Sequence, residues 1–315
     1  MKAAAPLTKA YLSAVLYALI IGFSFIFVKT ALVSTGPFDL LAHRFTISLA
    51  ALLVFLALSK TRLNIRKRDY LAILPMAVLY PVLFFAFQTF GLVQASASEA
   101  GIIQAAAPVF TMMLASVVLK ERTGLRQNLF IALSVAGGVY IFAMKGLDFR
   151  TMNGAGLFLI LLSALSSAGY SVLARKLSRN YTPLDLTFVS LLFGFIAFNG
   201  FAVIRRIVQG TLPLYFEPFG DLSFTVSVLF LGVLSSLASS FLSNYALSKM
   251  EAFKISIFSQ LATIVTMAAG VIILHEKLAY FHLIGAALMI AGVVGVCLPS
   301  SPRKISRQPE RRLDA

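Results

Sequence analysis

Amide and tyrosine side chains that interrupt long apolar stretches are the groups in this chain best suited to chemistry. The amides deep in such stretches are Gln88, Gln104, Asn244 and Gln260. A buried amide needs hydrogen-bond partners, so these residues either link helices or bind a solute. Tyrosines in similar stretches, which either pack or offer a face to a ring or a quaternary amine, are Tyr17, Tyr80 and Tyr170. We take these seven side chains as the candidate substrate-binding residues.

Three ionisable residues form a second group of candidates. Arg44 lies within an apolar stretch, where a charge is costly unless it is paired or lines water. It either braces helices or faces a pathway, or its side chain extends to the interface. Glu99 opens a helix, where the helix dipole favours a carboxylate. Glu99 and His43 are the alternative candidates for a group that gains and loses a proton.

The chain carries no recognisable catalytic motif. It contains no G-x-x-x-x-G-K-[ST], H-E-x-x-H, C-x-x-C or G-x-S-x-G pattern. Its three histidines fall in different segments, and its single cysteine, Cys297, cannot form an internal disulfide. We therefore expect no enzyme activity, no cofactor and no metal site.

The elements that must position these residues are long and apolar. Hydrophobic residues make up 59% of the chain and charged residues only 12%. A membrane-spanning helix needs about 20 apolar residues. Uncharged runs occupy 10–28, 45–59, 70–94, 100–119, 127–144, 151–174, 186–204, 222–248, 255–274 and 278–298. The second run is long enough if it starts near Phe38, so the fold class is an all-α integral membrane protein with ten transmembrane helices.

The net charge of +15 follows from topology. With the N-terminus inside, 20 of the 27 lysines and arginines fall in cytoplasmic segments and five in outer loops. This asymmetry is the positive-inside pattern, and an even number of spans places both termini in the cytoplasm. We therefore expect a multi-pass protein of the cytoplasmic membrane, with a lipid bilayer and no nucleic acid among its partners.

The chain also repeats itself. Residues 92–139 align without a gap with residues 247–294, and thirteen of the 48 pairs are identical. A unit of five spans ends on the opposite side from its start, so its copy must be inverted. The predicted divisions are a cytoplasmic N-terminus (1–9), two inverted five-helix repeats (10–146 and 147–298) and a disordered cytoplasmic tail (299–315). Pro81 and Pro108 are expected to bend the third and fourth spans.

The segment from Pro108 to Val139 resembles EamA-type permeases of the drug/metabolite transporter superfamily. The matching features in the first copy are Pro108, Glu121-Arg122, Gln127 and Gly137-Gly138-Val139. The second copy matches at Glu276 and Ala291-Gly292-Val293, and Arg44 lies where that family often has an arginine. Thr263 replaces a proline frequent in the second copy, so the resemblance does not predict a matching bend in the ninth span.

The resemblance implies a pathway between two inverted halves, bounded mainly by helices 1, 3, 4, 6, 8 and 9, and transport of small metabolites. Together with the repeat, it favours a secondary transporter with a small-molecule substrate, and neutral or aromatic amino acids are the first substrate class. Hydrophobic cations or quaternary amines, and sugar-phosphate or nucleotide-sugar anions, remain alternatives. A non-transporting membrane scaffold is the alternative from another class. Protons are a candidate coupling partner, and the sequence leaves the oligomeric state open.

Overall fold

A computed structural model describes residues 4–92, 94, 100, 103–121, 123–144, 154–274 and 279–298. These ranges are mainly helical and contain no strand. Nine helical stretches within them, some made of several consecutive helical elements, are long and apolar enough to cross a membrane, and Ala107–Val118 is a shorter apolar helix. The chain is therefore an all-α protein with the character of a multi-pass membrane protein. Glu99 and Glu276 lie outside the described residues.

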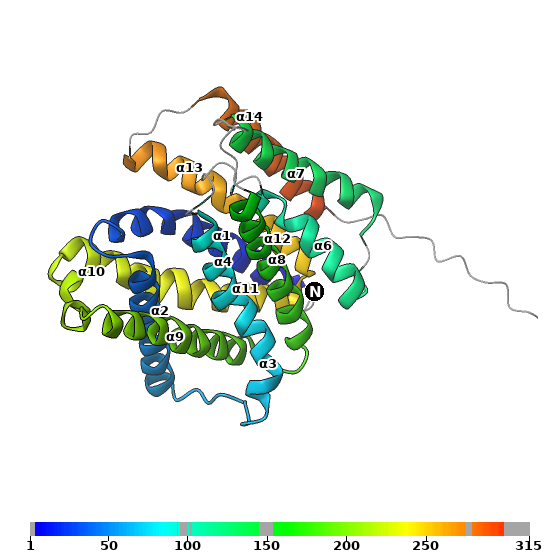
Figure 1. Ribbon diagram of the computed structural model, residues 1–315. Helices are drawn as coiled ribbons and strands as arrows, with labels where there is room; N and C mark the ends of the chain where they lie inside the picture. Colours follow the sequence, from blue (N-terminus) through cyan, green and yellow to red (C-terminus); the bar gives the residue numbers. More distant parts are fainter. Residues whose placement is uncertain are drawn as a thin grey trace, which may run out of the picture.

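The helices follow one another with short connections (Figure 1). The first half contains α1 (Ala4–Ala31), α2 (Pro37–Ser59), α3 (Asp69–Ala77), η1 (Val78–Leu83), α4 (Phe84–Leu92), α6 (Ala107–Val118) and α7 (Leu125–Met144). The second half contains α8 (Gly154–Leu177), α9 (Pro183–Val208), η2 (Leu212–Leu214), η3 (Glu217–Gly220), α10 (Leu222–Leu229), η4 (Phe230–Ala238), α11 (Ser239–Lys249), α12 (Ala252–Phe258), α13 (Gln260–Leu274) and α14 (Tyr280–Cys297).

Helices α2 and α9 begin in the same way. Each has a proline at its first turn, where the missing amide hydrogen costs nothing, and an aspartate three positions after the capping residue. In α9 the Thr182 hydroxyl accepts a hydrogen bond from the Asp185 backbone, and the Asp185 carboxylate accepts one from the Thr182 backbone. This capping box fixes where α9 starts.

Three of the spans are interrupted. The π-helical segment η1 separates α3 from α4, and Tyr80 there has non-helical dihedral angles (φ −143°, ψ 121°) beside Pro81. The chain turns at Ala106 before α6, two residues ahead of Pro108. The bends expected at these prolines are therefore confirmed. A second π-helical segment, η4, separates α10 from α11.

A break also occurs in the ninth span, where Thr263 gave no reason to expect one. Ser259 separates α12 from α13. Its hydroxyl donates to the Ser256 carbonyl (2.6 Å), and its carbonyl accepts from the Ala262 amide (3.1 Å) in a tight four-residue turn. Such local serine hydrogen bonds compete with regular helix, so this break needs no proline.

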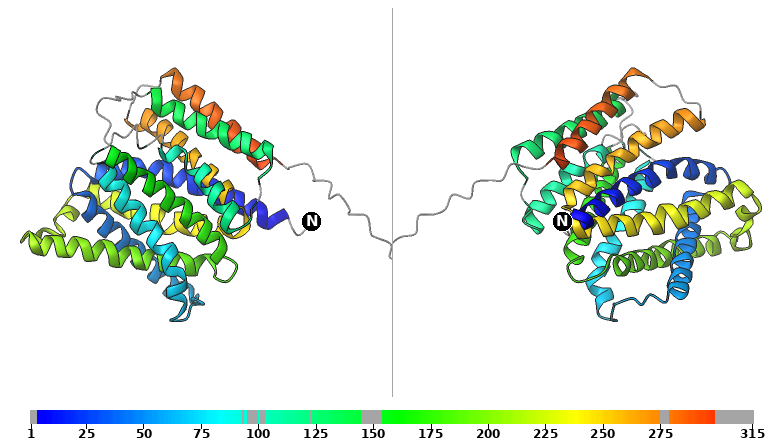
Figure 2. Two further views of the ribbon diagram at one scale, coloured as in Figure 1. Left: turned by 45° about the vertical axis from the view of Figure 1, so that its right-hand side comes forward. Right: turned by 180° about the vertical axis from the view of Figure 1, so that it is seen from behind.

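Helix packing brings segments far apart in the sequence together. Helix α7 lies along α14 at one edge of the molecule, and α2 crosses α9 elsewhere (Figures 1 and 2). The close approach of α7 and α14 depends on glycine, since a Cβ atom at Gly137 would lie 2.6 Å from the carbonyl oxygen of Gly285. Small residues allow such backbone contact, which drives helix association in lipid.

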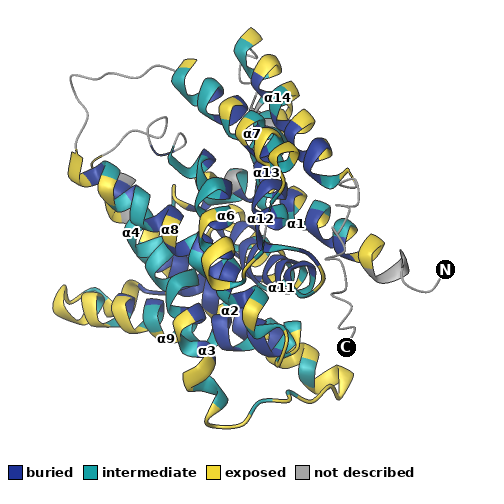
Figure 3. Ribbon diagram, turned by 90° about the vertical axis from the view of Figure 1, so that its right-hand side faces the viewer, coloured by how far each residue is buried: buried dark blue, intermediate teal, exposed yellow. Residues whose placement is uncertain are grey.

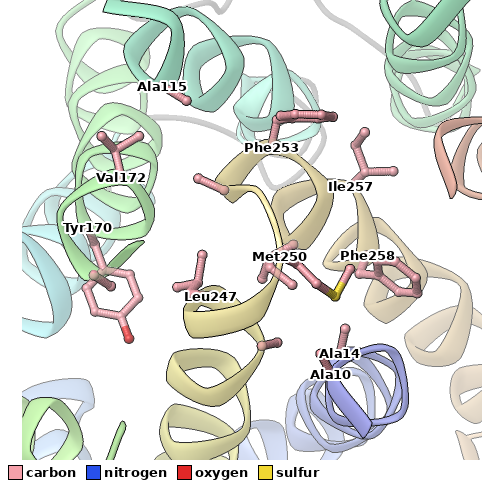
Figure 4. Packing of buried hydrophobic residues seen from close by; sticks show 14 of the residues in the cluster. Ala10, Ala14, Ala115, Tyr170, Val172, Leu247, Met250, Phe253, Ile257 and Phe258 are labelled. Carbon is pink, nitrogen blue, oxygen red and sulfur yellow. The ribbon is translucent and has the colours of Figure 1, made fainter. Parts of the chain in front are cut away.

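The two ends of the bundle differ. One end, which we call the basic face, carries the connections 60–68, 119–121, 123–124, 178–182 and 249–251. The other end, the opposite face, carries 32–36 and 209–221. Behind the basic face, buried apolar side chains from both halves pack together, as Figure 4 shows for Ala14 of α1, Leu247 of α11 and Phe253 of α12. Figure 3 shows burial concentrated on the inner helices, with exposed residues prominent on the outer ones.

Candidate functional site

A cavity of about 420 Å³ lies between helices from both halves of the chain. Its size falls within the usual range for small-molecule sites, about 300–1,000 Å³. The polar residues that line it are Tyr17, Tyr80, Gln88, Gln104, Ser167, Tyr170, Ser171, Ser239, Ser240, Ser243, Ser256, Ser259, Gln260, Thr263 and Thr266. The larger apolar residues that line it are Ile21, Phe84, Ile141, Phe142, Ile255 and Met267.

Six of the seven amides and tyrosines singled out from the sequence line this cavity, and Asn244 is the exception. The wall comes from the spans that the family resemblance implied, with α7 in addition. The apolar cluster behind the basic face includes Tyr170 and Ile255, which also line the cavity. The cavity is therefore separated from the basic face by packed side chains.

Several lining residues have polar groups free for a solute, and the largest of these are an amide and two phenols. Within the described part of the chain, the Gln88 amide and the hydroxyls of Tyr17 and Tyr80 form no hydrogen bond. Tyr80 owes its position to the η1 interruption, and its ring packs against Phe84 and Tyr170, each at 5.0 Å between centroids. These groups can donate hydrogen bonds to a bound molecule or accept hydrogen bonds from it.

Other lining residues use their polar groups to hold the wall together. The Gln104 amide donates to the Ser163 hydroxyl (3.2 Å). The Gln260 amide donates to the Ala105 carbonyl (2.6 Å), which lies at the break ahead of Pro108. A broken helix leaves carbonyls unpaired, so Gln260 compensates for the break in the other half.

Asn244 lies behind the wall. It is fully buried, its oxygen accepts from the Tyr170 hydroxyl (2.9 Å), and its nitrogen donates to the Thr187 hydroxyl (3.0 Å). Both ends of the amide are therefore satisfied, and Asn244 positions Tyr170 rather than facing the cavity.

Sequence reasoning missed the hydroxyl-rich wall contributed by α11 and its surroundings. Ser239, Ser240 and Ser243 line the cavity. Their spacing of one and four residues places them on one side of a helix, and Ser235 and Ser236 extend the same pattern backwards by one turn. That periodicity was available in the sequence and could have identified this face.

The described wall of the cavity contains no charged side chain. Its chemistry is that of hydroxyls, amides and aromatic faces. No group of three or more His, Cys, Asp or Glu residues that could hold a metal ion was found among the described residues.

Arg44 does not extend to the surface. Its side chain is buried (6% exposed), and it donates through Nε to the Ser236 hydroxyl (2.5 Å) and through Nη2 to the hydroxyl (3.1 Å) and carbonyl (3.2 Å) of Ser235. It also lies over the ring of Phe85 at 5.4 Å. The guanidinium thus braces α2 against η4.

His43 lies away from the cavity, at the opposite face. Its Nε2 is 3.0 Å from the carbonyl oxygen of Tyr215, and its ring packs on that tyrosine at 4.4 Å. Asp39, which precedes His43 by one turn, forms an ion pair with Arg206 (3.1 Å). Burial, followed by the charge of Asp39, raises the pKa of Tyr215 to about 12, so its hydroxyl stays protonated. This cluster fastens the segment 209–221 to α2 and α9.

Glu121 links three segments at the basic face. Its carboxylate accepts from Arg175 Nε (3.4 Å) and from the backbone amide of Ala252 (3.2 Å), while Arg175 also donates to the Leu247 carbonyl (2.9 Å). Burial raises the pKa of the Glu121 carboxyl group, although the Ala252 amide and Arg175 act in the other direction. The equivalent Glu276, and Glu99, lie outside the described residues.

Apolar spans surrounding a hydroxyl- and amide-lined cavity define a membrane protein with an internal binding space. Comparison with known proteins gives the class. The model of the EamA-like transporter family matches residues 8–143 and again residues 154–298. The chain belongs to the EamA-like transporter family, and transporters are not an enzyme class.

Individual relatives agree with this assignment. An uncharacterized transporter of Bacillus subtilis (strain 168), YcxC, is 53% identical over 288 residues, covering 91% of this chain and 92% of the relative. A probable amino-acid metabolite efflux pump of Escherichia coli (strain K12) is 24% identical over 281 residues, covering 89% and 92%. A crystal structure at 16% identity has a TM-score of 0.74 and covers 93% of this chain and 98% of that chain, which shows a shared fold.

Proposed function

We propose that this protein is a secondary transporter that moves small organic metabolites across the cytoplasmic membrane by alternating access, with neutral or aromatic amino acids as its first substrate class. The observation that carries this proposal is the cavity of about 420 Å³, lined by helices of both halves and by free amide and hydroxyl groups. Binding sites between the repeats of a membrane protein are typical of secondary transporters.

The proposal includes ten spans arranged as two inverted five-helix repeats, 10–146 and 147–298. Three observations support it. The family model matches each half separately. The pairing of α1 with α11 has its counterpart in the pairing of α8 with α4. Gln260 contacts Ala105, and these positions are 155 residues apart, the offset of the sequence repeat. Equivalent residues meet where a twofold axis passes, so this contact fits a pseudo-twofold axis at the cavity.

Charge supports the orientation that we propose. The basic face carries the arginine- and lysine-rich connections, including 60–68, and positive charge collects on the cytoplasmic side of membrane proteins. Both termini then lie in the cytoplasm, with 1–9 preceding the first span and 299–315 as a tail. The packed cluster behind the basic face would close the cavity toward the cytoplasm.

Several features support the substrate class. The described wall has no fixed charge, which disfavours sugar phosphates and nucleotide sugars, because phosphate recognition uses convergent cations. Phe84 and Phe142 supply aromatic surface beside the free hydroxyls of Tyr17 and Tyr80. The Escherichia coli relative named as a probable amino-acid metabolite efflux pump is consistent with this class.

Tracer counterflow in proteoliposomes tests the proposed function. Vesicles loaded with an unlabelled neutral or aromatic amino acid should accumulate the labelled form, and protein-free liposomes should not. Gln88→Ala and Tyr80→Phe, which remove polar groups that are free for a solute, should shift the preference among substrates at equal protein incorporation. A scaffold would leave an imposed gradient intact, and unchanged preference in both variants would contradict the assignment of the cavity.

A further inference from the structure

Arg44 carries a positive charge that no acidic side chain neutralises within the described residues. Its hydrogen-bond partners are the hydroxyls and a carbonyl of Ser235 and Ser236, and its ring contacts are to Phe45 and Phe85. Asp39, the acid on the same helix, pairs with Arg206 instead. These neutral partners accept hydrogen bonds from Nε and Nη2 of the guanidinium, but its net charge remains.

This charge lies just behind the wall of the cavity. The Arg44 guanidinium is 5.4 Å from the Phe85 ring centre, and that ring is 5.6 Å from the ring of Tyr80, so the guanidinium lies within about 11 Å of Tyr80. Tyr80 itself lines the cavity. On the other side, Ser239 and Ser240 line the cavity one helical turn beyond the serines that hold Arg44.

A buried charge acts over such distances. In a medium with an effective dielectric constant of about 20, a unit charge at about 10 Å changes the affinity for another unit charge by roughly tenfold or more. The described wall itself carries no charge of either sign, so nothing within it offsets this field. The cavity therefore has a positive electrostatic bias at the end formed by Tyr80 and Ser239.

We propose that Arg44 is a specificity-determining residue, whose buried charge favours substrates with a carboxylate over organic cations of the same shape. This inference rests on the proposed function and extends it to the substrate's ionic form. The carboxylate of the substrate points toward Tyr80, and an ammonium group points toward the other end of the cavity. Quaternary amines and hydrophobic cations are then excluded by charge, although aromatic faces are present to receive them.

Matched ligands test this proposal. L-phenylalanine, N-acetyl-L-phenylalanine and L-phenylalaninol share a side chain but are a zwitterion, an anion and a cation. Their half-maximal competing concentrations are measured against labelled L-phenylalanine in counterflow. In the unmodified protein, L-phenylalaninol should compete at least about tenfold more weakly than L-phenylalanine, a difference of about 1.4 kcal/mol. N-acetyl-L-phenylalanine should also compete more strongly than L-phenylalaninol.

Variants assign the discrimination to the charge. Arg44→Gln should bring the ratio of the half-maximal competing concentrations of L-phenylalaninol and L-phenylalanine toward one. Arg44→Lys should preserve the ratio of the unmodified protein. Ser236→Asp places an acid beside the retained guanidinium and should also remove the discrimination, whereas Ser236→Asn should not. Arg126→Gln, at the basic face, serves as the control. Because Ser236→Asp keeps the arginine, it gives a result even if Arg44→Gln fails to fold.

Unchanged ligand ratios in folded Arg44→Gln or Ser236→Asp would overturn the proposal, because a purely structural brace predicts lost stability with the same selectivity. If the unmodified protein exchanges no L-phenylalanine, the proposed substrate class fails separately. The role of Arg44 is then decided by calorimetric binding of N-acetyl-L-phenylalanine and L-phenylalaninol to the unmodified and Ser236→Asp proteins. Tighter binding of N-acetyl-L-phenylalanine than of L-phenylalaninol, with the difference lost in Ser236→Asp, supports the proposed role of Arg44. Equal binding of the two ligands to the unmodified protein contradicts that role.

Discussion

At the scale of single residues, the polar side chains of the cavity divide into those that face a solute and those that maintain the wall. Gln88 belongs to the first group, because its amide forms no hydrogen bond within the described residues. Gln260 belongs to the second, since it donates to the Ala105 carbonyl. Both are glutamines in apolar spans, so their pairing state, not their residue type, should determine what each contributes.

Truncating these two glutamines should have opposite consequences. Gln88→Ala should weaken substrate binding severalfold without lowering the melting temperature, since no internal hydrogen bond is lost. Gln260→Ala should destabilise the protein by about 1–2 kcal/mol, because the Ala105 carbonyl is left unpaired. Thermal unfolding in detergent and substrate titration measure the two effects. A loss of stability in Gln88→Ala equal to that in Gln260→Ala would contradict this division.

The sequence identified the amides and tyrosines of the cavity wall, but neither its serines and threonines nor the hydrogen-bond partners of these residues. Hydrophobicity is a local property, so amides within apolar runs could be recognised, and six of the seven chosen side chains line the cavity. Whether an amide is free depends on contacts between distant helices, as with Asn244 and Thr187. For the same reason, the sequence left open whether Arg44 reaches the surface or is held between helices.

At the scale of elements, the junction of α6, α8 and the α11–α12 connection holds the basic face closed. Glu121 and Arg175 join these segments directly. Burial raises the pKa of Glu121 in this conformation. A solvated carboxylate would titrate near its ordinary value of about 4.3, so the closed conformation binds the proton more tightly than an open one. Lower pH should therefore favour closure.

Labelling measures this pH dependence. In a Cys297→Ser background, Ser243→Cys places a thiol in the cavity, and a membrane-impermeant maleimide applied at the basic face reports opening. At about pH 7 the protein with Glu121 should label faster than Glu121→Gln, which mimics the protonated acid. The two rates should converge as the pH falls through the raised pKa of Glu121. The ratio of the two labelling rates is compared across pH, because the titration of the thiol itself affects both rates equally. A ratio that does not change with pH would rule out Glu121 as the cause.

The contact between α7 and α14 provides a test of packing. A Cβ atom at Gly137 would lie 2.6 Å from the Gly285 carbonyl oxygen and 2.8 Å from the Leu288 Cβ. Neither atom can move without shifting a helix, so Gly137→Ala should destabilise the protein by about 1–3 kcal/mol. Gly200→Ala, in α9 with nothing within 4 Å, is the control and should leave the melting temperature unchanged or raise it. Equal melting temperatures would show that α7 and α14 do not pack as described.

The breaks within helices could be predicted only in part from the sequence. Proline predicted the interruptions near Pro81 and Pro108, because a missing donor is visible in the residue type. The break at Ser259 arises from hydrogen bonds of a serine, which elsewhere in the chain lies inside regular helix, as Ser166 does. A side chain that can satisfy either conformation does not reveal which one it adopts.

At the scale of the whole molecule, the helices of both halves surround one cavity, and the apolar cluster separates it from the basic face. The spans were predictable because their length and composition are dictated by the bilayer. The arrangement around the cavity required the structure, since Tyr17 and Gln260 are far apart in sequence and lie on one wall. The proposal that a solute crosses the membrane through this cavity is the claim on which the others rest.

Blocking the cavity tests that claim most directly. Counterflow of labelled amino acids is compared among the unmodified protein, Ser243→Trp, whose indole would fill the cavity, and Ser116→Trp, whose new side chain lies on an exposed face of α6. We expect exchange of at least one neutral or aromatic amino acid by the unmodified and Ser116→Trp proteins, and at least about tenfold slower exchange by folded Ser243→Trp. Exchange that continues unchanged with the cavity filled, or no exchange of any amino acid by the unmodified protein, would contradict this route or this substrate class.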